Sequence, residues 1–209
     1  SRPPSGLGEA DMVGEFPVEG GITRFLAVFQ SHDALRIGPV RSARAYMIDW
    51  AREVDAIFAH VGGHHEALRR LASEDRAIPN ADAFQTGNTF WRDTSRTPPH
   101  STYTSAERLQ KLIERRGWNG SSTIAGWHFG EPEGERAKLL TIDWGNPLFA
   151  VGYSYDEDIG AYVRELAGAP HRLADGGELA PANVVIMFVR VLGAPERGTG
   201  TLTIRKLGE

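Results

Sequence analysis

Apolar and polar residues in the first half of the chain form blocks that predict strands and helices in turn. These blocks predict a buried central strand at 22–29, a helix at 42–54, a second buried strand at 55–61 and a helix at 65–73. Ser42 is the expected N-cap of the first helix, and Gly62-Gly63 closes the second strand. This succession of strand, glycine turn and helix is typical of an α/β layer structure.

The remainder of the first half adds a loop and one more helix. Turn-forming residues over 78–99 predict a long loop, and 105–116 predicts a helix that ends at Gly117. We therefore expect a mixed α/β domain over residues 1–118.

Short apolar runs separated by Gly, Pro, Asn and Asp dominate the second half. They predict a hairpin of 148–155 with 161–166, the strongest single strand at 183–192 and a closing strand at 199–207. Tyr153, Tyr155 and Tyr162 are the expected cross-strand partners of the hairpin. We expect a mostly antiparallel, β-rich domain over 119–209, with the loop at 130–135 as a flexible connection. The fold class is α/β in the first domain and α+β over the whole chain.

Composition excludes several classes of function. The chain has 209 residues and a formal net charge of −4, so its surface carries no overall positive field for nucleic acid. It has no cysteine, which removes disulfides, thiolate zinc sites and cysteine nucleophiles. Its apolar runs are far shorter than the ~20 residues that cross a bilayer. Any site for an anion must therefore be local.

Arginines beside glycine-rich turns indicate such a local site. Arg24, Arg41 and Arg44 lie next to Gly20-Gly21 and Gly38-Pro39. Arginine stays charged at ordinary pH and pairs bidentately with carboxylate or phosphate. The pattern predicts an anion-binding site, completed by Arg92, His100 and Tyr103. The alternative is that these arginines are already neutralised by Glu15, Glu19 or Asp49, because a buried arginine needs a partner.

His100 and Asp93 are the candidates for proton transfer. His100 titrates near neutrality and is followed by Ser101, Thr102, Tyr103 and Thr104. No Gly-x-Ser-x-Gly turn occurs, so a serine nucleophile has no support. The structural alternatives are a loop hydrogen bond for His100 and a turn or ion pair for Asp93.

The histidines at 60, 64 and 65 do not have the spacing of a metal site. His60 and His64 are four apart, but Gly62-Gly63 breaks the helix that would bring them together. We predict no metal and no cofactor.

Five segments of the first half carry a resemblance to a known family, namely 5–11, 19–25, 37–44, 90–93 and 99–105, and looser similarity occurs at Trp144, 153–162, Gly177 and 183–185. They resemble the YerB-like lipoprotein family of bacteria, whose domains have no known function. The resemblance implies an extracytoplasmic, cell-surface protein tethered by a lipidated N-terminus that is absent from this sequence. It also implies further strands before and after the residues present here.

The order of segments in this chain is also weakly similar to that of the LytR-CpsA-Psr phosphotransferases, which bind a lipid pyrophosphate with arginines. This chain lacks the acidic metal ligands of those enzymes in sequence order, so the similarity suggests only that arginines bind a phosphate group.

Three functions remain open from the sequence. The first is a module that binds an anionic small molecule or cell-wall polymer. The second is a phosphotransferase or hydrolase of envelope polymers, with His100 or Asp93 moving the proton. The third is a protein-interaction module that uses the β-rich half.

Overall fold

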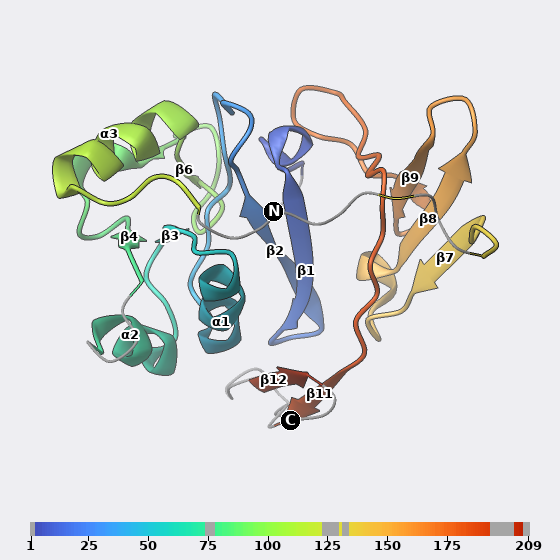
Figure 1. Cartoon of the computed structure of the whole chain (residues 1–209), viewed down its shortest axis with the longest axis horizontal. Coiled ribbons are helices and arrows are strands. Elements are labelled where there is room, and N and C mark those ends of the chain that lie inside the picture. The colour runs from blue at the N-terminus through green and yellow to red at the C-terminus, as the bar shows by residue number, and fades with distance from the viewer. Residues whose placement is uncertain (1–2, 74–77, 123–129, 131–133, 193–202, 207–209) are drawn as a thin grey trace. The chain divides into compact units, whose positions relative to one another are not determined.

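The computed structural model describes residues 3–73, 78–122, 130, 134–192 and 203–206. Figure 1 follows the chain through these residues, which belong to two compact units. The first unit contains Ser1–Val13 and Leu26–Ile124, and the second contains Gly14–Phe25 and Ala125–Glu209. The boundary predicted between residues 118 and 119 stays a prediction.

A parallel pair of strands with a helical crossover lies at the centre of the first unit. Strand β3 (Phe58–His60) pairs with β4 (Asn80–Asp82), and helix α2 (His65–Ala72) connects them. Helix α1 (Ala45–Glu53) packs beside α2, and Arg70 of α2 joins the two by bonding the Asp49 carboxylate. The buried apolar residues that these elements share are Tyr46, Met47, Ile48, Ala51, Phe58, Ala67, Leu71 and Ala81.

Helix α1 begins later than the sequence predicted, and Ser42 does not cap it. The N-cap is Arg44, which makes no side-chain capping bond. The preceding residues pair instead with the end of β3, since the Val61 N–H donates to the Arg41 carbonyl (3.1 Å) and the Ala43 N–H to the Gly62 carbonyl (2.9 Å). The backbone at 41–43 is therefore extended, and the helix starts only beyond it.

The segment predicted as a loop over 78–99 contains regular structure. Besides β4 it holds a 3-10 turn, η3 (Gly87–Thr89), and strand β5 (Trp91–Arg92), which pairs antiparallel with β6 (Thr102–Tyr103). Helix α3 (Ala106–Arg116) follows and is confirmed. Its N-cap Ser105 accepts from the Arg108 N–H (3.3 Å), and Gly117 ends it in the left-handed conformation.

The strand predicted at 22–29 exists but is not a buried central one. Strand β2 (Ile22–Val28) pairs only with β1 (Met12–Val18) in the described sheets, and all seven residues of β2 are half-buried. A two-stranded ribbon leaves each strand with one unpaired edge, so neither is enclosed. A short 3-10 turn, η1 (Leu7–Glu9), precedes the hairpin.

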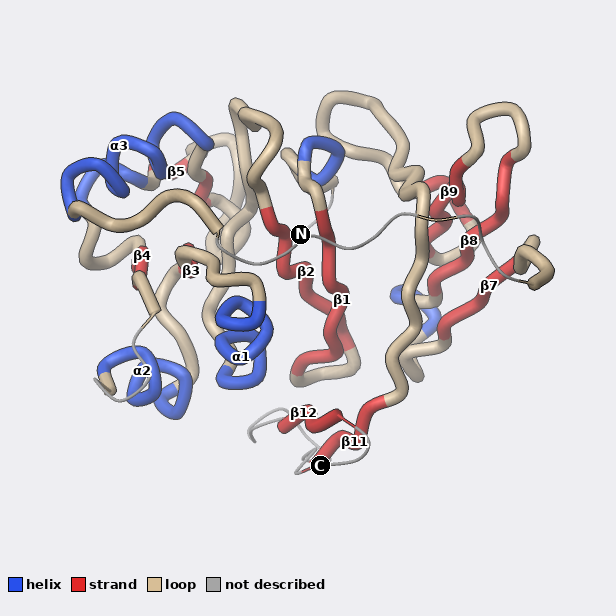
Figure 2. The backbone as a smooth tube through the Cα atoms, in the orientation of Figure 1, coloured by secondary structure: helices blue, strands red, loops and turns tan. Residues whose placement is uncertain are grey.

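The largest of the described sheets lies in the second unit and is antiparallel, as predicted. Figure 2 shows β7 (Leu139–Ile142), β8 (Val151–Asp156) and β9 (Ala161–Leu166), to which β10 (Ala169–Pro170) adds at the edge. The 3-10 turn η4 (Pro147–Phe149) leads into β8. Tyr155 and Tyr162 face each other across β8 and β9 with ring centroids 5.1 Å apart, which confirms two of the three predicted tyrosine partners. Tyr153 lies opposite Arg164 instead.

The strand predicted over 183–192 is much shorter than expected. Only β11 (Val189–Leu192) forms, paired antiparallel with β12 (Thr203–Lys206). Residues 183–188 are not in a strand, and Val185 and Phe188 are 69% and 78% exposed. A strand needs a neighbour for its backbone groups, and among the described residues this stretch has none.

The described residues therefore have the mixed α/β architecture that the sequence predicted, with an antiparallel β-rich second unit. Residues 131–133, the middle of the predicted connecting loop, lie outside the described residues. No helix in the described part of the chain is long and apolar enough to cross a membrane.

Candidate functional site

Two of the predicted site residues, Arg41 and His100, meet in the first unit. The Arg41 guanidinium donates to the Pro99 carbonyl, and its Nη1 lies 3.4 Å from Nδ1 of His100. The backbone brings them together, because the Val40 N–H donates to the Thr102 carbonyl (2.8 Å). We call this place the Arg41–His100 corner.

Positive charge is concentrated at this corner. Burial, and then the neighbouring charge of Arg44, lowers the pKa of Arg41 below its ordinary value. No carboxylate lies within 4 Å of the Arg41 guanidinium among the residues that the structure describes. Burial also lowers the pKa of His100, and the charges of Arg41 and Arg96 add to the effect. An anion placed here would relieve repulsion between these cations and would not have to displace a described carboxylate.

Two of the three acids that could have neutralised these arginines bind other residues. Glu15 pairs with Arg164 at 2.7 Å, and Asp49 pairs with Arg70. Glu15 and Asp49 are therefore not the acids that would neutralise the predicted arginine cluster.

The remaining two arginines of the predicted cluster differ in position. Arg44 lies near Arg41, and its Nη1 donates to the Ala43 carbonyl at 3.0 Å. Arg24 belongs to the second unit, whereas Arg41, Arg44, Arg92 and His100 belong to the first. Arg24, Arg44 and Glu19 each have further interactions, so none of them is a free side chain.

Asp93 is held in a structural arrangement. Its Oδ1 accepts from the Ser95 N–H (2.9 Å) and hydroxyl, and its Oδ2 binds the Arg36 guanidinium. Hydrogen bonds from Ser95, followed by that from Arg36, lower the pKa of Asp93 to about 2. A carboxylate that is ionised at neutral pH and fully engaged is poorly suited to proton transfer.

Tyr103 belongs to the core and not to an open site. Its side chain is fully buried, and the Arg36 guanidinium stacks on its ring at 3.9 Å from the centroid. The pKa of Arg36 is raised, since Asp93 and Tyr103 together outweigh the opposing effect of burial. Tyr103 therefore supports the arrangement around Asp93, and a ligand does not reach it.

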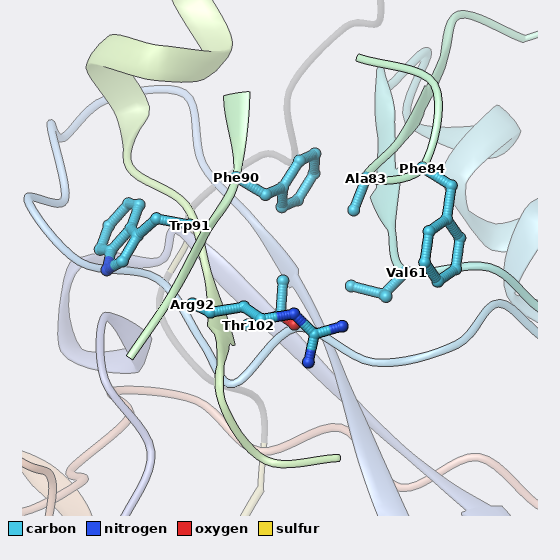
Figure 3. Close-up of a pocket in the computed structure, with 7 residues that line it drawn as sticks. All are labelled: Val61, Ala83, Phe84, Phe90, Trp91, Arg92 and Thr102. Atoms are coloured by element: carbon cyan, nitrogen blue, oxygen red, sulfur yellow. The ribbon is translucent and has the colours of Figure 1, made fainter. Parts of the chain in front are cut away.

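Arg92 borders a shallow hollow of about 150 Å³ in the first unit. Figure 3 shows the rings of Phe84 and Phe90 on two sides of this space, with the Arg92 guanidinium extending past Thr102. The ring of Trp91 points away from the other labelled side chains. The guanidinium of Arg92 forms no hydrogen bond or ion pair with the residues that the structure describes.

The three histidines near β3 have different environments. His60 is buried, and its ring nitrogens each lie 2.7 Å from an oxygen, Nδ1 from the Gly62 carbonyl and Nε2 from Oδ1 of Asn80. His64 and His65 stack with centroids 4.0 Å apart. The described residues include no group of three His, Cys, Asp or Glu side chains that could hold a metal.

Sequence reasoning missed the hollow and the contributions of Arg96 and Phe84. For Phe84, the available sequence signal was an aromatic residue inside a predicted loop. The structure shows that this residue is 72% exposed. The position of Arg96 near His100 depends on the turn at 93–96, where the Arg96 N–H donates to the Asp93 carbonyl (3.2 Å). The sequence predicted a turn at Asp93 as one alternative, but it did not indicate that this turn brings Arg96 near His100.

Comparisons with known proteins identify relatives of the chain. The B. subtilis (strain 168) protein "Putative lipoprotein YerB" is 36% identical over 173 residues, which are 80% of this chain and 52% of the relative. The crystal structure of YerB from Bacillus subtilis superimposes with a TM-score of 0.79 at 31% identity, covering 97% of this chain and 69% of that one. The chain thus spans about half the length of the curated relative it matches.

The family described as "Protein of unknown function (DUF3048) N-terminal domain" matches residues 1–119, which contain the Arg41–His100 corner and the hollow. This match covers more than half of the chain, and the relatives above are similar over most of it. The chain belongs to the DUF3048 family of YerB-like proteins.

Proposed function

We propose that the first unit binds an anionic group, a phosphate or carboxylate of a cell-envelope component, at the Arg41–His100 corner. The relative's name, "Putative lipoprotein YerB", supports an extracytoplasmic location for such a ligand. The module binds without a cofactor, and its ligand is a small anion or a repeating polymer that presents the same group.

The observation that carries this proposal is the half-buried Arg41 without a described carboxylate partner. Leaving an arginine partly desolvated beside Arg44 and His100 is unfavourable in the free protein. Such an arrangement is retained where an incoming negative charge gains from it, because guanidinium donors then form charge-assisted hydrogen bonds. Arg24 has no role in this proposal, which uses residues of the first unit alone.

Replacing Arg41 by Gln should remove binding while preserving the fold. We expect affinity for poly(glycerol phosphate) or polyglutamate to fall by about tenfold or more, since one charge-assisted contact is worth roughly 1.5–3 kcal/mol. The unfolding free energy should fall by no more than about 1.5–3 kcal/mol, because Arg41 loses its hydrogen bond to the Pro99 carbonyl but has no described ion pair to lose. Calorimetric titration and thermal denaturation measure the two effects.

Arg69→Gln is the matched control, because Arg69 is an exposed arginine on α2 of the same unit. It removes the same net charge and should leave affinity within about twofold. Equal losses in both variants would indicate nonspecific attraction and contradict the proposal. Unfolding of the Arg41 variant would show that Arg41 is a structural residue.

Binding should strengthen as the pH falls. The pKa of His100 is below its ordinary value in the free protein, so the ring is neutral at pH 7. A bound anion favours the charged ring and raises the pKa of His100, so affinity for a phosphodiester polymer should rise as the pH falls through that pKa. The polymer keeps its own charge over this range. Titrations at pH 5 and pH 8 test this, and His100→Gln should abolish the difference between them.

The exposed stretch 183–188 favours a second candidate function, strand pairing with another polypeptide. Its side chains Val185, Ile186, Met187 and Phe188 are all exposed, and its backbone is unpaired among the described residues. An apolar, unpaired and extended segment can accept a strand from another chain. A second copy is the simplest partner.

Association of copies through 183–188 predicts concentration-dependent sedimentation. The double variant Val185→Ser, Phe188→Ser should remain monomeric at concentrations where the parent protein associates, because it removes two exposed apolar side chains. Ile159→Ser, at an exposed apolar side chain of the β8–β9 turn, is the control and should associate like the parent. A parent protein that stays monomeric would rule out self-pairing.

A further inference from the structure

The hollow beside Arg92 lies where a parallel sheet commonly binds ligands. Val61 directly follows β3, and Ala83 and Phe84 directly follow β4, so these lining residues stand at the carboxyl ends of the two parallel strands. Ligands of α/β proteins bind outside the carboxyl ends of such strands, where loops leave in different directions. Phe90, Trp91 and Arg92, with Thr102, close the other side.

The walls of the hollow suit one apolar ring. Val61, Ala83, Phe84 and Phe90 supply apolar surface, and Phe84 is 72% exposed although it adjoins this surface. The volume of about 150 Å³ is that of a cavity that accepts a benzene-sized guest. A planar group between Phe84 and Phe90 would take apolar surface of both rings out of water.

The hollow also has a charged side. The guanidinium of Arg92 extends past Thr102 along it (Figure 3), and no described residue hydrogen-bonds to that guanidinium. The Thr102 hydroxyl has no hydrogen-bond partner among the described residues either. A cation and a hydroxyl at one side of an apolar space match a ligand with an acidic group at one end.

The shape of the hollow is fixed by backbone contacts. Oδ1 of buried Asp82 accepts from the Gly62 N–H (3.0 Å) and from the Phe84 N–H (3.1 Å), so one carboxylate holds both turns. At Gly62 the chain has φ 55°, and a Cβ there would lie 3.0 Å from the Phe84 ring. Glycine at this position therefore lets the ring pack over the turn.

We infer that this hollow is a binding site for a small aromatic acid, whose ring lies between Phe84 and Phe90 and whose carboxylate binds Arg92. This site is additional to the Arg41–His100 corner and uses none of the residues assigned there. It gives the first unit a second, chemically different specificity.

Benzoate, benzyl alcohol and acetate are suitable probes, followed in amide NMR spectra of the whole chain. Benzoate should bind saturably in the millimolar range or tighter, with shifts at Ala83, Phe84 and Arg92. Benzyl alcohol keeps the ring without the charge, and acetate keeps the charge without the ring. Each should bind about tenfold more weakly than benzoate.

Variants at exposed positions separate the two contributions without unfolding the protein. Arg92→Gln should weaken benzoate about tenfold and leave benzyl alcohol unchanged, whereas Phe84→Ala should weaken both. Arg69→Gln, at an exposed arginine of the same unit, is the control and should leave benzoate within about twofold. Absence of saturable benzoate binding, or unchanged benzoate affinity in Arg92→Gln, would overturn this inference. An equal loss of benzoate binding in Arg69→Gln would indicate nonspecific attraction to positive charge and would overturn it as well.

Discussion

Glu15→Gln is expected to destabilise the second unit by about 3–5 kcal/mol, since it leaves a buried arginine without its counter-ion. Arg164 is 3% exposed in its side chain and Glu15 is 10% exposed, and their closest atoms lie 2.7 Å apart. The Arg164 guanidinium also contacts Nδ1 of His171 and the Tyr153 hydroxyl (3.2 Å), neither of which is a carboxylate. Thr23 also donates to Glu15 (2.6 Å) and would lose its charged acceptor.

Chemical denaturation followed by near-ultraviolet circular dichroism measures this loss. The exposed pair Arg172–Glu178, at 2.9 Å in the same unit, provides the control. Glu178→Gln should cost about 1 kcal/mol or less, because solvent screens that pair. The double variant Glu15→Leu, Arg164→Met should recover most of the stability, since it removes both buried charges. Equal costs at Glu15 and Glu178 would contradict the argument.

Gly38→Ala is expected to destabilise the first unit by about 2–4 kcal/mol, through overpacking and backbone strain. A Cβ at residue 38 would lie 2.7 Å from Cδ1 of the fully buried Tyr103 and 3.0 Å from the Thr102 carbonyl. The φ of 147° at Gly38 is one that residues with side chains rarely adopt. The Tyr103 ring cannot move away easily, because Arg36 stacks on it.

Gly87→Ala separates the steric effect from the conformational one. Gly87 has φ 62°, but nothing lies within 4 Å of a Cβ built there. We expect about 1 kcal/mol for this control, from the left-handed backbone alone. Thermal denaturation of both variants measures the difference, and equal costs would mean that the contact with Tyr103 is unimportant.

The elements that the sequence predicted well are those with local determinants. Helix α3 is an example, because its cap Ser105 and its terminating Gly117 both lie next to it in the chain. The β8–β9 hairpin is another, since its strands are joined by a short turn and Tyr155 faces Tyr162 across them.

The elements that the sequence missed, or predicted wrongly, depend on pairing with distant segments of the chain. Strand β4 is three residues long, with two polar residues, and it forms because it pairs with β3. Residues 183–188 have strong β propensity, yet no described segment pairs with them. Propensity indicates which residues suit a strand, but pairing decides whether a strand forms.

The sequence predicted which types of residue form the candidate site, but it did not predict which of those residues lie together. Arg41 and His100 were both chosen for their chemistry, and the antiparallel pairing of Ile37 with Thr104 brings their segments together. Arg24 was chosen on the same grounds but belongs to the other unit. Nothing in the sequence around Arg24 or Arg41 indicates which of the two units that arginine belongs to.

The link between Glu15 and Arg164 has a practical consequence for dissecting the protein. These residues are 149 positions apart, yet both belong to the second unit. A fragment that starts at residue 119 would contain the whole β7–β10 sheet but would lack the acid that neutralises its buried arginine. Anyone expressing the two halves separately should therefore supply residues 14–25 to the C-terminal half, fused or as a peptide, to obtain soluble material.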